Sequence, residues 1–476
     1  MTHKIRKQVM DLAISSRLDA FKTQHLAGHY YYRCLLPALE KVFDSLSVPG
    51  EYIQIEQLEI DLGVLSPGLL QLTAPTPELE THLRQQIQEA LRLNSKQSAI
   101  HPVTQQEHAC MQWLFYMEHG ALNWNSIPSD EDTYTFILQS LATNYALAQQ
   151  LRRLLLRNRH ALRRIVHEHP ESFLLRLIEI ISAMAHTTLP EIINELAAWL
   201  HTPGTAVFKS MTAIRHELWQ QLLFEAARQQ HQPATLQLAT SVVRHYLSAG
   251  ILHIQQKDLS GDSMLQNICK AILQENHHAI SQPITHQNEK ETKSVETFYH
   301  NQEENPNSNL HEIWLVHAGL VLVHPFLGTL FNRLELVAGN RFKDGNALHR
   351  ALHLLHYIAT GREAPKEYEL TTPKVLCGMP VQESIAAEIV LTKEEKQEAD
   401  TLLSVVIEKW EKLKNVSIAA LQENFLQRSG KLYTQNNTTT IQVENGSLDV
   451  LLDFLPWTLS MIKLPWMKEL LRITWR

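Results

Sequence analysis

The spacing of apolar and polar residues changes along this chain. Between residues 78 and 282, apolar residues recur at three- and four-residue steps, which is typical of amphipathic helices that pack on one another. Residues 16–46 have the same helical spacing. They lie between two runs, 3–14 and 51–65, that favour extended strands. The pattern therefore predicts a strand-helix-strand unit followed by a helical middle.

The C-terminal third mixes helical and alternating spacing. Its predicted helices cover residues 346–360, 394–413 and 417–427. Residues 431–444 alternate around Asn436-Asn437 and predict a β-hairpin, and residues 456–475 predict one or two final strands. The whole chain is thus predicted to be mainly α with smaller α+β ends: a strand-helix-strand N-terminal unit, a helical middle and an α+β C-terminal module, not a doubly wound sheet.

Composition and proline placement suggest a division into four parts. Residues 281–309, SQPITHQNEKETKSVETFYHNQEENPNSN, hold almost no apolar residues and predict a flexible polar linker. The predicted parts are an N-terminal unit at 1–75, a helical region at 76–280, this linker at 281–309, and a C-terminal module at 310–476.

The helical region is expected to consist of short helices. They are predicted at 78–93, 105–120, 130–148, 149–168, 171–187, 189–201, 212–230, 234–249 and 262–280. Gly120 is placed to end the second of them. The run at 150–169 is rich in arginine, and we interpret it as solvated arginines beside a leucine stripe, with His167 and His169 exposed. A nucleic-acid groove is the alternative, but the run lacks interleaved stacking aromatics.

Residues 313–331, IWLVHAGLVLVHPFLGTLF, form the most apolar window of the chain. Its length approaches that of a membrane span. However, Pro325, two histidines and two glycines make it a poor lipid-facing helix. We therefore predict a buried core segment in which His324-Pro325-Phe326 turns against the final PWMK segment. A partner-binding surface and membrane insertion are the alternatives.

Charge and cysteine content narrow the classes of function. The net charge of −7 gives no positive field for nucleic acid or acidic membranes, so nucleic-acid binding is not expected. The residues of the apolar window argue against a stable membrane span. The four cysteines are scattered and form no CxxC pair, which predicts buried free thiols in the cytosol. The N-terminal residues lack the apolar run of a signal peptide.

Common catalytic signatures are absent from the sequence, including the phosphate-binding loop, GxGxxG, HExxH and GxSxG. His349, His353 and His356 share one face of a predicted helix, where two of them could ligate zinc. We interpret them as structural, with a histidine-dependent metalloenzyme as a remote alternative. Cys377 is predicted to be a buried thiol instead of a nucleophile. No catalytic residue, cofactor or metal is therefore predicted.

Aromatic and proline residues of the C-terminal module are the candidates for protein interaction. Such residues are enriched both in cores and at subunit interfaces. The candidates are Trp314, His324, Pro325, Phe326, Trp457, Pro465, Trp466, Met467 and Trp475.

Several blocks resemble the tape measure proteins of contractile injection systems, which are phage-tail-like delivery machines. The N-terminal blocks are HKIRKQVMDL, LLPALEKVFD and QLEIDLG, followed by MQWLFYMEHGALNW. The most specific blocks are HAGLVLVHPFLGTLF, ALHLLHYIATG, VLCGMPV, EKWEKLKNVSIAALQENFLQRSGKL and DVLLDFLPWTLSMIKLPWMKELLRITW. The resemblance implies a non-enzymatic structural protein that helps set inner-tube length or assembly.

The resemblance also implies partners and a location. The partners would be tube, baseplate or other particle subunits, or copies of the chain itself. The protein would lie in the cytoplasm during assembly or within the assembled particle. Drawn out as a rod, about 200 helical residues would span about 300 Å, but the short, proline-separated helices favour packing on each other. A cytoplasmic assembly chaperone or adaptor for tube subunits or cargo remains the alternative.

Overall fold

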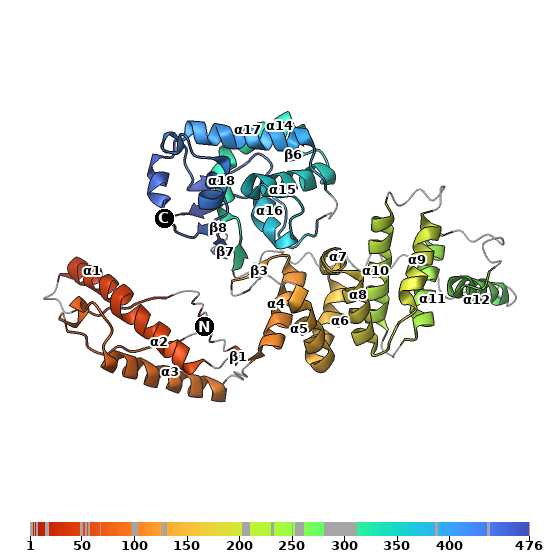
Figure 1. The fold of residues 1–476 in the computed structure, drawn as a ribbon, viewed down its shortest axis with the longest axis horizontal. Helices are drawn as coiled ribbons and strands as arrows, with labels where there is room; N and C mark the ends of the chain where they lie inside the picture. The colour runs from red at the N-terminus through yellow and green to blue at the C-terminus, as the bar shows by residue number, and fades with distance from the viewer. Residues whose placement is uncertain are drawn as a thin grey trace. The chain divides into compact units, whose positions relative to one another are not determined.

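A computed structural model describes residues 3–475, apart from 4, 6–7, 15–18, 48–50, 53–54, 56–57, 67, 98–102, 125, 127–130, 202–209, 230–232, 250, 253–260, 280–311, 386–388 and 436–437. The chain forms two compact units, Met1–Ala109 and Cys110–Arg476. The protein is mainly α-helical, with a small mixed sheet, as the sequence predicts (Figure 1). The predicted four-part division stays a prediction, and the predicted linker at 281–309 lies outside the described residues.

The first unit is built on two long helical segments. Its elements are α1 Ala20–Tyr30, η1 Tyr31–Leu35, α2 Leu36–Leu46, β1 Glu51–Tyr52, η2 Leu69–Gln71, α3 Pro77–Gln97 and β2 Val103–Thr104. Asp19 caps α1 by accepting hydrogen bonds from the backbone of Phe21 and Lys22. The helix predicted over 16–46 is continuous from Ala20 but contains the π-helical turn η1 just before Pro37. The wider turn accommodates the proline ring, which would clash with the carbonyl four residues earlier in a regular helix.

The two predicted N-terminal strands differ from the structure. The described residues of 3–14 include no strand, and within 51–65 the described strand is only the two-residue β1, which pairs antiparallel with β2. Leu58, Ile60 and Leu62 instead pack as extended chain against the core of α2 and α3. The alternating apolar residues thus form one buried side of an extended segment, although this segment pairs with no described strand.

In the second unit, residues 110–279 form an array of short helices, here called the helical array. It contains most of α4 Gln105–His119, β3 Leu122–Asn123, α5 Glu131–Thr143, α6 Tyr145–Arg157, α7 Arg159–Glu168, α8 Glu171–Ser182, α9 Leu189–Leu200, α10 Met211–Arg228, α11 Thr235–Ser248 and α12 Met264–Ala279. Helix α10 lies at the centre and contacts α6, α7, α8, α9 and α11. Its Ile214, Leu218, Leu222 and Leu223 are buried in one apolar core.

The helical array differs from the predicted boundaries at α8, which ends at Ser182 instead of residue 187, and most clearly over residues 130–168. The sequence predicts helices at 130–148 and 149–168, whereas the structure has three helices, because Asn144 and Asn158 interrupt the pattern. Asn144 accepts two backbone hydrogen bonds from the first turn of α6, and Asn158 accepts one from the first turn of α7, so each begins the following helix. The predicted stop at Gly120 is confirmed, since this residue follows α4 with φ +68°.

The C-terminal module, residues 312–475, combines helices with a six-stranded mixed sheet. Its helices are η4 Ala318–Val323, α14 His324–Arg333, α15 Gly345–Thr360, η5 Glu367–Leu370, α16 Thr371–Leu376, α17 Lys393–Lys409, η6 Glu411–Leu413, α18 Ile418–Leu421, η7 Gln422–Leu426 and η8 Asp449–Phe454. Its strands are β4 Ile313–Leu315, β5 Val337–Ala338, β6 Arg341–Phe342, β7 Gly430–Gln435, β8 Thr438–Val443, β9 Met461–Ile462 and β10 Leu471–Thr474.

The main sheet has the strand order β3-β4-β7-β8-β10-β9. Strands β7 and β8 form the predicted hairpin, although its turn, Asn436-Asn437, lies outside the described residues. Strand β10 runs parallel to β8 and antiparallel to β9, which confirms the prediction of final strands. Strand β3 pairs with β4, so the helical array contributes an edge strand to the sheet of the C-terminal module.

The apolar window at 313–331 is a buried core segment, as predicted. It forms β4, the 3-10 helix η4 and the start of α14, and all six residues of η4 are buried. Gly319 fits there because η4 passes directly over η7: a Cβ atom at this position would lie 1.7 Å from the carbonyl oxygen of Phe425. No described helix is long and apolar enough to cross a membrane.

Candidate functional site

The structure places the predicted interaction residues on several elements of the C-terminal module. Trp314 is half-buried on β4 and packs against the core of the helical array. The predicted turn at His324-Pro325-Phe326 is wrong: these residues form the first turn of α14, where a proline near the N-terminus leaves no helical hydrogen bond unmade. Phe326 packs edge-on against Trp457, with ring centroids 5.1 Å apart.

The tryptophans near the end of the chain anchor the module internally. The indole N–H of Trp457 donates to the carbonyl of Leu322 at 3.0 Å, and that of Trp466 donates to the carbonyl of Leu376 at 2.8 Å. The Trp466 ring also lies 5.2 Å from that of Phe331. Of the remaining candidates, Pro325 and Pro465 are exposed, whereas His324, Met467 and Trp475 are half-buried. Their role in binding a partner stays a prediction.

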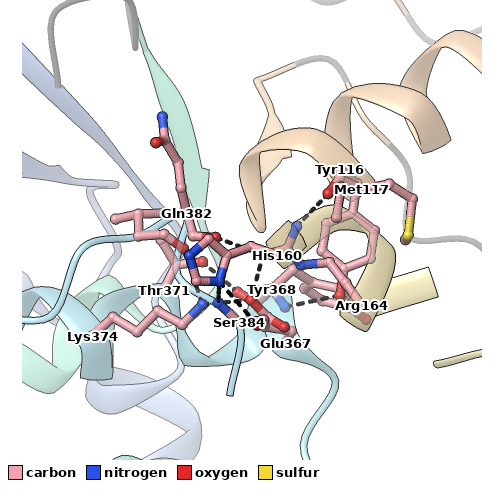
Figure 2. A network of polar contacts seen from close by, with 12 residues as sticks. Tyr116, Met117, His160, Arg164, Glu367, Tyr368, Thr371, Lys374, Gln382 and Ser384 are labelled. Carbon is pink, nitrogen blue, oxygen red and sulfur yellow. Dashed lines mark hydrogen bonds and ion pairs between the residues drawn. The ribbon is translucent and has the colours of Figure 1, made fainter. Parts of the chain in front are cut away.

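A buried network of charged residues joins the helical array to the C-terminal module (Figure 2). At its centre, Glu367 of η5 accepts hydrogen bonds from Arg164 of α7 at 2.7 Å and from Lys374 of α16 at 2.6 Å. Arg164 is 1% exposed and Lys374 is fully buried, so all three charges are out of water. Burial alone would raise the pKa of Glu367, but the cations Lys374 and Arg164 hold it below its usual value.

Both cations also donate to backbone carbonyls, whereas Nε of Arg164 has no hydrogen-bond partner among the described residues. Arg164 donates to the carbonyl of Met117 and, at 2.9 Å, to that of Gln382, while Lys374 donates to the carbonyl of Val381 at 3.0 Å. A buried ion pair is stable only when such additional hydrogen bonds compensate for the lost hydration. The network therefore joins α4, α7, η5, α16 and the 381–384 loop.

Gly120 makes room for this network. A Cβ atom at this position would lie 2.5 Å from a terminal nitrogen of Arg164 and 2.9 Å from the carbonyl oxygen of Val381. Its φ of +68° also disfavours any residue with a side chain. The end of α4 and the path of the Arg164 side chain thus depend on the same glycine.

A second polar group extends the network along α7. The Tyr116 hydroxyl donates to the Glu168 carboxylate, which also accepts the backbone N–H of Glu367 at 3.0 Å. The same hydroxyl accepts the backbone N–H of Tyr368 at 3.2 Å. Burial raises the pKa of Glu168, and the nearby Glu367 charge raises it further. Buried side chains of the helical array thus fix the backbone of η5.

Histidines of α7 and its C-terminus complete the buried polar contacts. The backbone N–H of Ser384 donates to Nδ1 of His160 at 3.1 Å, so this nitrogen is unprotonated. Burial, followed by the charge of Arg164, lowers the pKa of His160 to about 4. His169 accepts the indole N–H of Trp113 at Nε2 (3.0 Å), and its Nδ1–H donates to the carbonyl of Ile165 (2.9 Å).

The exposed arrangement predicted for this helix is therefore wrong at three residues. Arg164 and His169 are buried and His167 is half-buried, and burial lowers the pKa of both His167 and His169 to about 4. The pattern of leucines predicts one buried face of α7, but α7 packs against both α10 and the network residues. The sequence around Arg164 gives no indication that this arginine is buried, because its acidic partner Glu367 lies far away along the chain.

The predicted group of His349, His353 and His356 does not assemble around a common point. Nδ1 of His353 donates to the carbonyl of His349 within α15 at 2.9 Å. Only His356 belongs to a cluster of possible ligand atoms in the described part of the chain, and its companions there are His317 and Glu369. Cys377 is buried, and burial raises the pKa of its thiol, as expected for an unreactive cysteine. All four cysteines are free and buried.

These features define a helical protein whose buried charges bind its own segments to one another. The family model for the contractile injection system tape measure protein matches residues 2–475, so the chain belongs to that family. It is a structural family, and its members are parts of a contractile injection system that contains other subunits. No curated protein and no solved structure matches the chain.

Proposed function

We propose that the protein is a non-catalytic assembly component that helps to set the length of the inner tube, and that it acts in its folded form. The observation that carries the proposal is the continuous apolar core of the helical array. Its helices run from 10 residues in α7 to 18 residues in α10, and each places an apolar face against its neighbours. Such a chain is a packed scaffold and not an extended rod.

The energetic cost of unpacking supports this choice. Leu151, Leu177 and Leu223, on three different helices, are fully buried in this core. Drawing the array out into one helix would expose these side chains, and each buried leucine contributes about 1.5–3 kcal/mol to folding. The extended form would also break the network around Glu367. We infer that length control operates through contacts of the folded chain with tube, baseplate or other subunits, or with its own copies.

The contact surface for these partners is proposed on the C-terminal module. The exposed Pro325 and Pro465 flank half-buried aromatic rings, including Phe326 and Trp466, that the module core holds in place. Rigid, partly exposed aromatic residues are efficient anchors because they bind with little loss of side-chain entropy. During assembly the protein would work in the cytoplasm, and it would either stay in the particle or be released.

A set of chain-length variants tests the folded-scaffold proposal. Deletion of the gene should give tubes of abnormal length or no particles, and normal particles in normal number would contradict the proposal. Insertions of increasing length at 281–309 should leave tube length unchanged, whereas a ruler would lengthen the tube by about 1.5 Å per added helical residue. A matched control replaces the same segment with a shuffled sequence of equal length and should leave tube length unchanged.

Mass spectrometry of purified particles distinguishes retention from release. Peptides of this chain in finished particles would support a resident scaffold. Their absence, together with defective tubes in the deletion strain, would instead favour the cytoplasmic chaperone or adaptor.

A further inference from the structure

His317, His356 and Glu369 bring three potential metal ligands together inside the C-terminal module. One nitrogen from each histidine and one carboxylate oxygen all lie within 4.8 Å of one another. Nε2 of His317 is 4.0 Å from Oε1 of Glu369, and Nε2 of His356 is 3.8 Å from Oε2 of the same carboxylate. These distances are too long for hydrogen bonds, so the three groups face a common point without bonding to one another.

Both imidazoles leave nitrogens without a partner in the interior. His317 is 3% exposed and neither of its ring nitrogens has a hydrogen bond, and His356 is 1% exposed with an unbonded Nε2. A buried polar atom without a partner carries an energetic cost. A group that binds these nitrogens would remove that cost.

The tautomer of His356 is the one that metal ligation requires. Its Nδ1 lies 3.1 Å from the carbonyl oxygen of Arg362. A carbonyl oxygen only accepts hydrogen bonds, so Nδ1 carries the proton and the lone pair is on Nε2, the atom that points towards Glu369. A histidine ligand is commonly oriented in this way, by donating its other N–H to a backbone carbonyl.

The position of Glu369 is also fixed. One oxygen accepts the backbone N–H of Lys366 at 2.9 Å, and the other pairs with Arg362 at 3.1 Å. The Arg362 side chain is 66% exposed and can move into solvent when a cation replaces it, so the ion pair costs little to break. The Glu369 carboxylate thus supplies the negative charge that a divalent cation needs.

We propose that His317, His356 and Glu369 bind one divalent transition-metal ion, with zinc the best fit. Two imidazoles and one carboxylate form a common zinc ligand set, with a water in the fourth position. Zinc bonds of about 2.0–2.1 Å place tetrahedral ligand atoms about 3.4 Å apart, so the side chains would close by about 1 Å. His317 follows β4, His356 lies in the second half of α15 and Glu369 lies in η5, so the ion would join three separate segments of the module.

The test uses the full-length purified protein, stripped of metal and titrated with Zn²⁺ alone by calorimetry, and with Co²⁺ by visible absorption. The expected result is one equivalent bound, a Co²⁺ spectrum typical of tetrahedral nitrogen and oxygen ligands, and a higher thermal midpoint with metal. His317→Gln, His356→Gln and Glu369→Gln should each weaken binding by about tenfold or more. His349→Gln, two turns earlier on α15, is the matched control and should bind as the parent does.

Two results would overturn the proposal. One is the absence of one-equivalent binding by the parent protein, a measurement that does not depend on the folding of any variant. The other is equal binding by the parent and by folded ligand variants, which would place the ion elsewhere. The site does not depend on the proposed role in assembly, so tube-length measurements and metal titrations fail separately.

Discussion

The helical array and the C-terminal module are held together in different ways. Within the array, successive helices such as α5 and α6, α6 and α7, and α11 and α12 pack against each other. In the module, the sheet pairs β4 with β7, which lies many helices later in the chain, and β8 with β10, which follows η8 and β9. Caps and local apolar faces therefore determine the array, whereas close backbone approaches determine the module. The Glu367 network is the point at which the two kinds of construction meet.

The largest expected effect on stability comes from removing a charge of the Glu367 network. Arg164→Met removes one of the two cations that pair with Glu367, together with the buried hydrogen bonds of the guanidinium. The free energy of unfolding should therefore fall by about 3–5 kcal/mol. Urea unfolding, followed by circular dichroism and tryptophan fluorescence, measures this change. Arg157→Met, at an exposed arginine at the end of α6, should change stability by less than about 0.5 kcal/mol.

The triple variant Arg164→Met, Glu367→Leu, Lys374→Met sharpens the result. It removes all three buried charges together, so it should be more stable than Arg164→Met alone. If the triple variant were less stable than Arg164→Met, the remaining Glu367–Lys374 pair would itself make a net contribution to stability.

The next effect concerns the module alone. Gly319→Ala places a methyl group against the Phe425 carbonyl, and the backbone of η7 must move to admit it. Overpacking of this kind costs about 1–3 kcal/mol, with more where backbone obstructs the added atom. Gly328→Ala on α14 is the control, because a Cβ atom there meets no atom within 4 Å. Equal unfolding curves for the two variants would contradict the close approach of η4 and η7.

Acid should weaken the helical array through His169. Its pKa is about 4 in the folded chain against an ordinary 6.5, so the unfolded chain takes up the proton first as the pH falls. The free energy of unfolding is therefore unaffected by this group above pH 6.5. It decreases progressively towards pH 4, by up to about 3 kcal/mol, as His169 becomes protonated in the unfolded chain. His169→Gln still offers an acceptor to Trp113 but does not titrate, so its stability should fall less over this range. Parallel pH profiles would count against the buried histidine.

The smallest expected effect tests local control within the array. Asn144→Ala removes the two hydrogen bonds that begin α6 and should cost about 1 kcal/mol. Asn144→Ser keeps a capping oxygen and should recover most of this loss. Thermal unfolding of the three proteins side by side measures the difference, and identical midpoints would refute the capping role.

The same contrast explains what could be predicted from the sequence. Local signals such as the helical period, the stop at Gly120 and the β7–β8 hairpin are correct, because neighbouring residues determine them. Asn144 and Asn158 were missed as helix starts, although their side chains are good caps. The partners of Arg164, and the grouping of His317 with His356 and Glu369, could not be predicted, because each depends on segments that only the tertiary fold brings together.

The pairing of β3 with β4 also has a consequence for synthesis on the ribosome. Strand β3, at 122–123, emerges with the first helices of the array, but its partner at 313–315 is translated much later. Strand β10, at 471–474, must follow before the sheet is complete. The array can therefore begin to fold during translation with an open strand edge, and such edges are prone to pair with other chains. The main sheet is therefore complete only when nearly the whole chain has been translated.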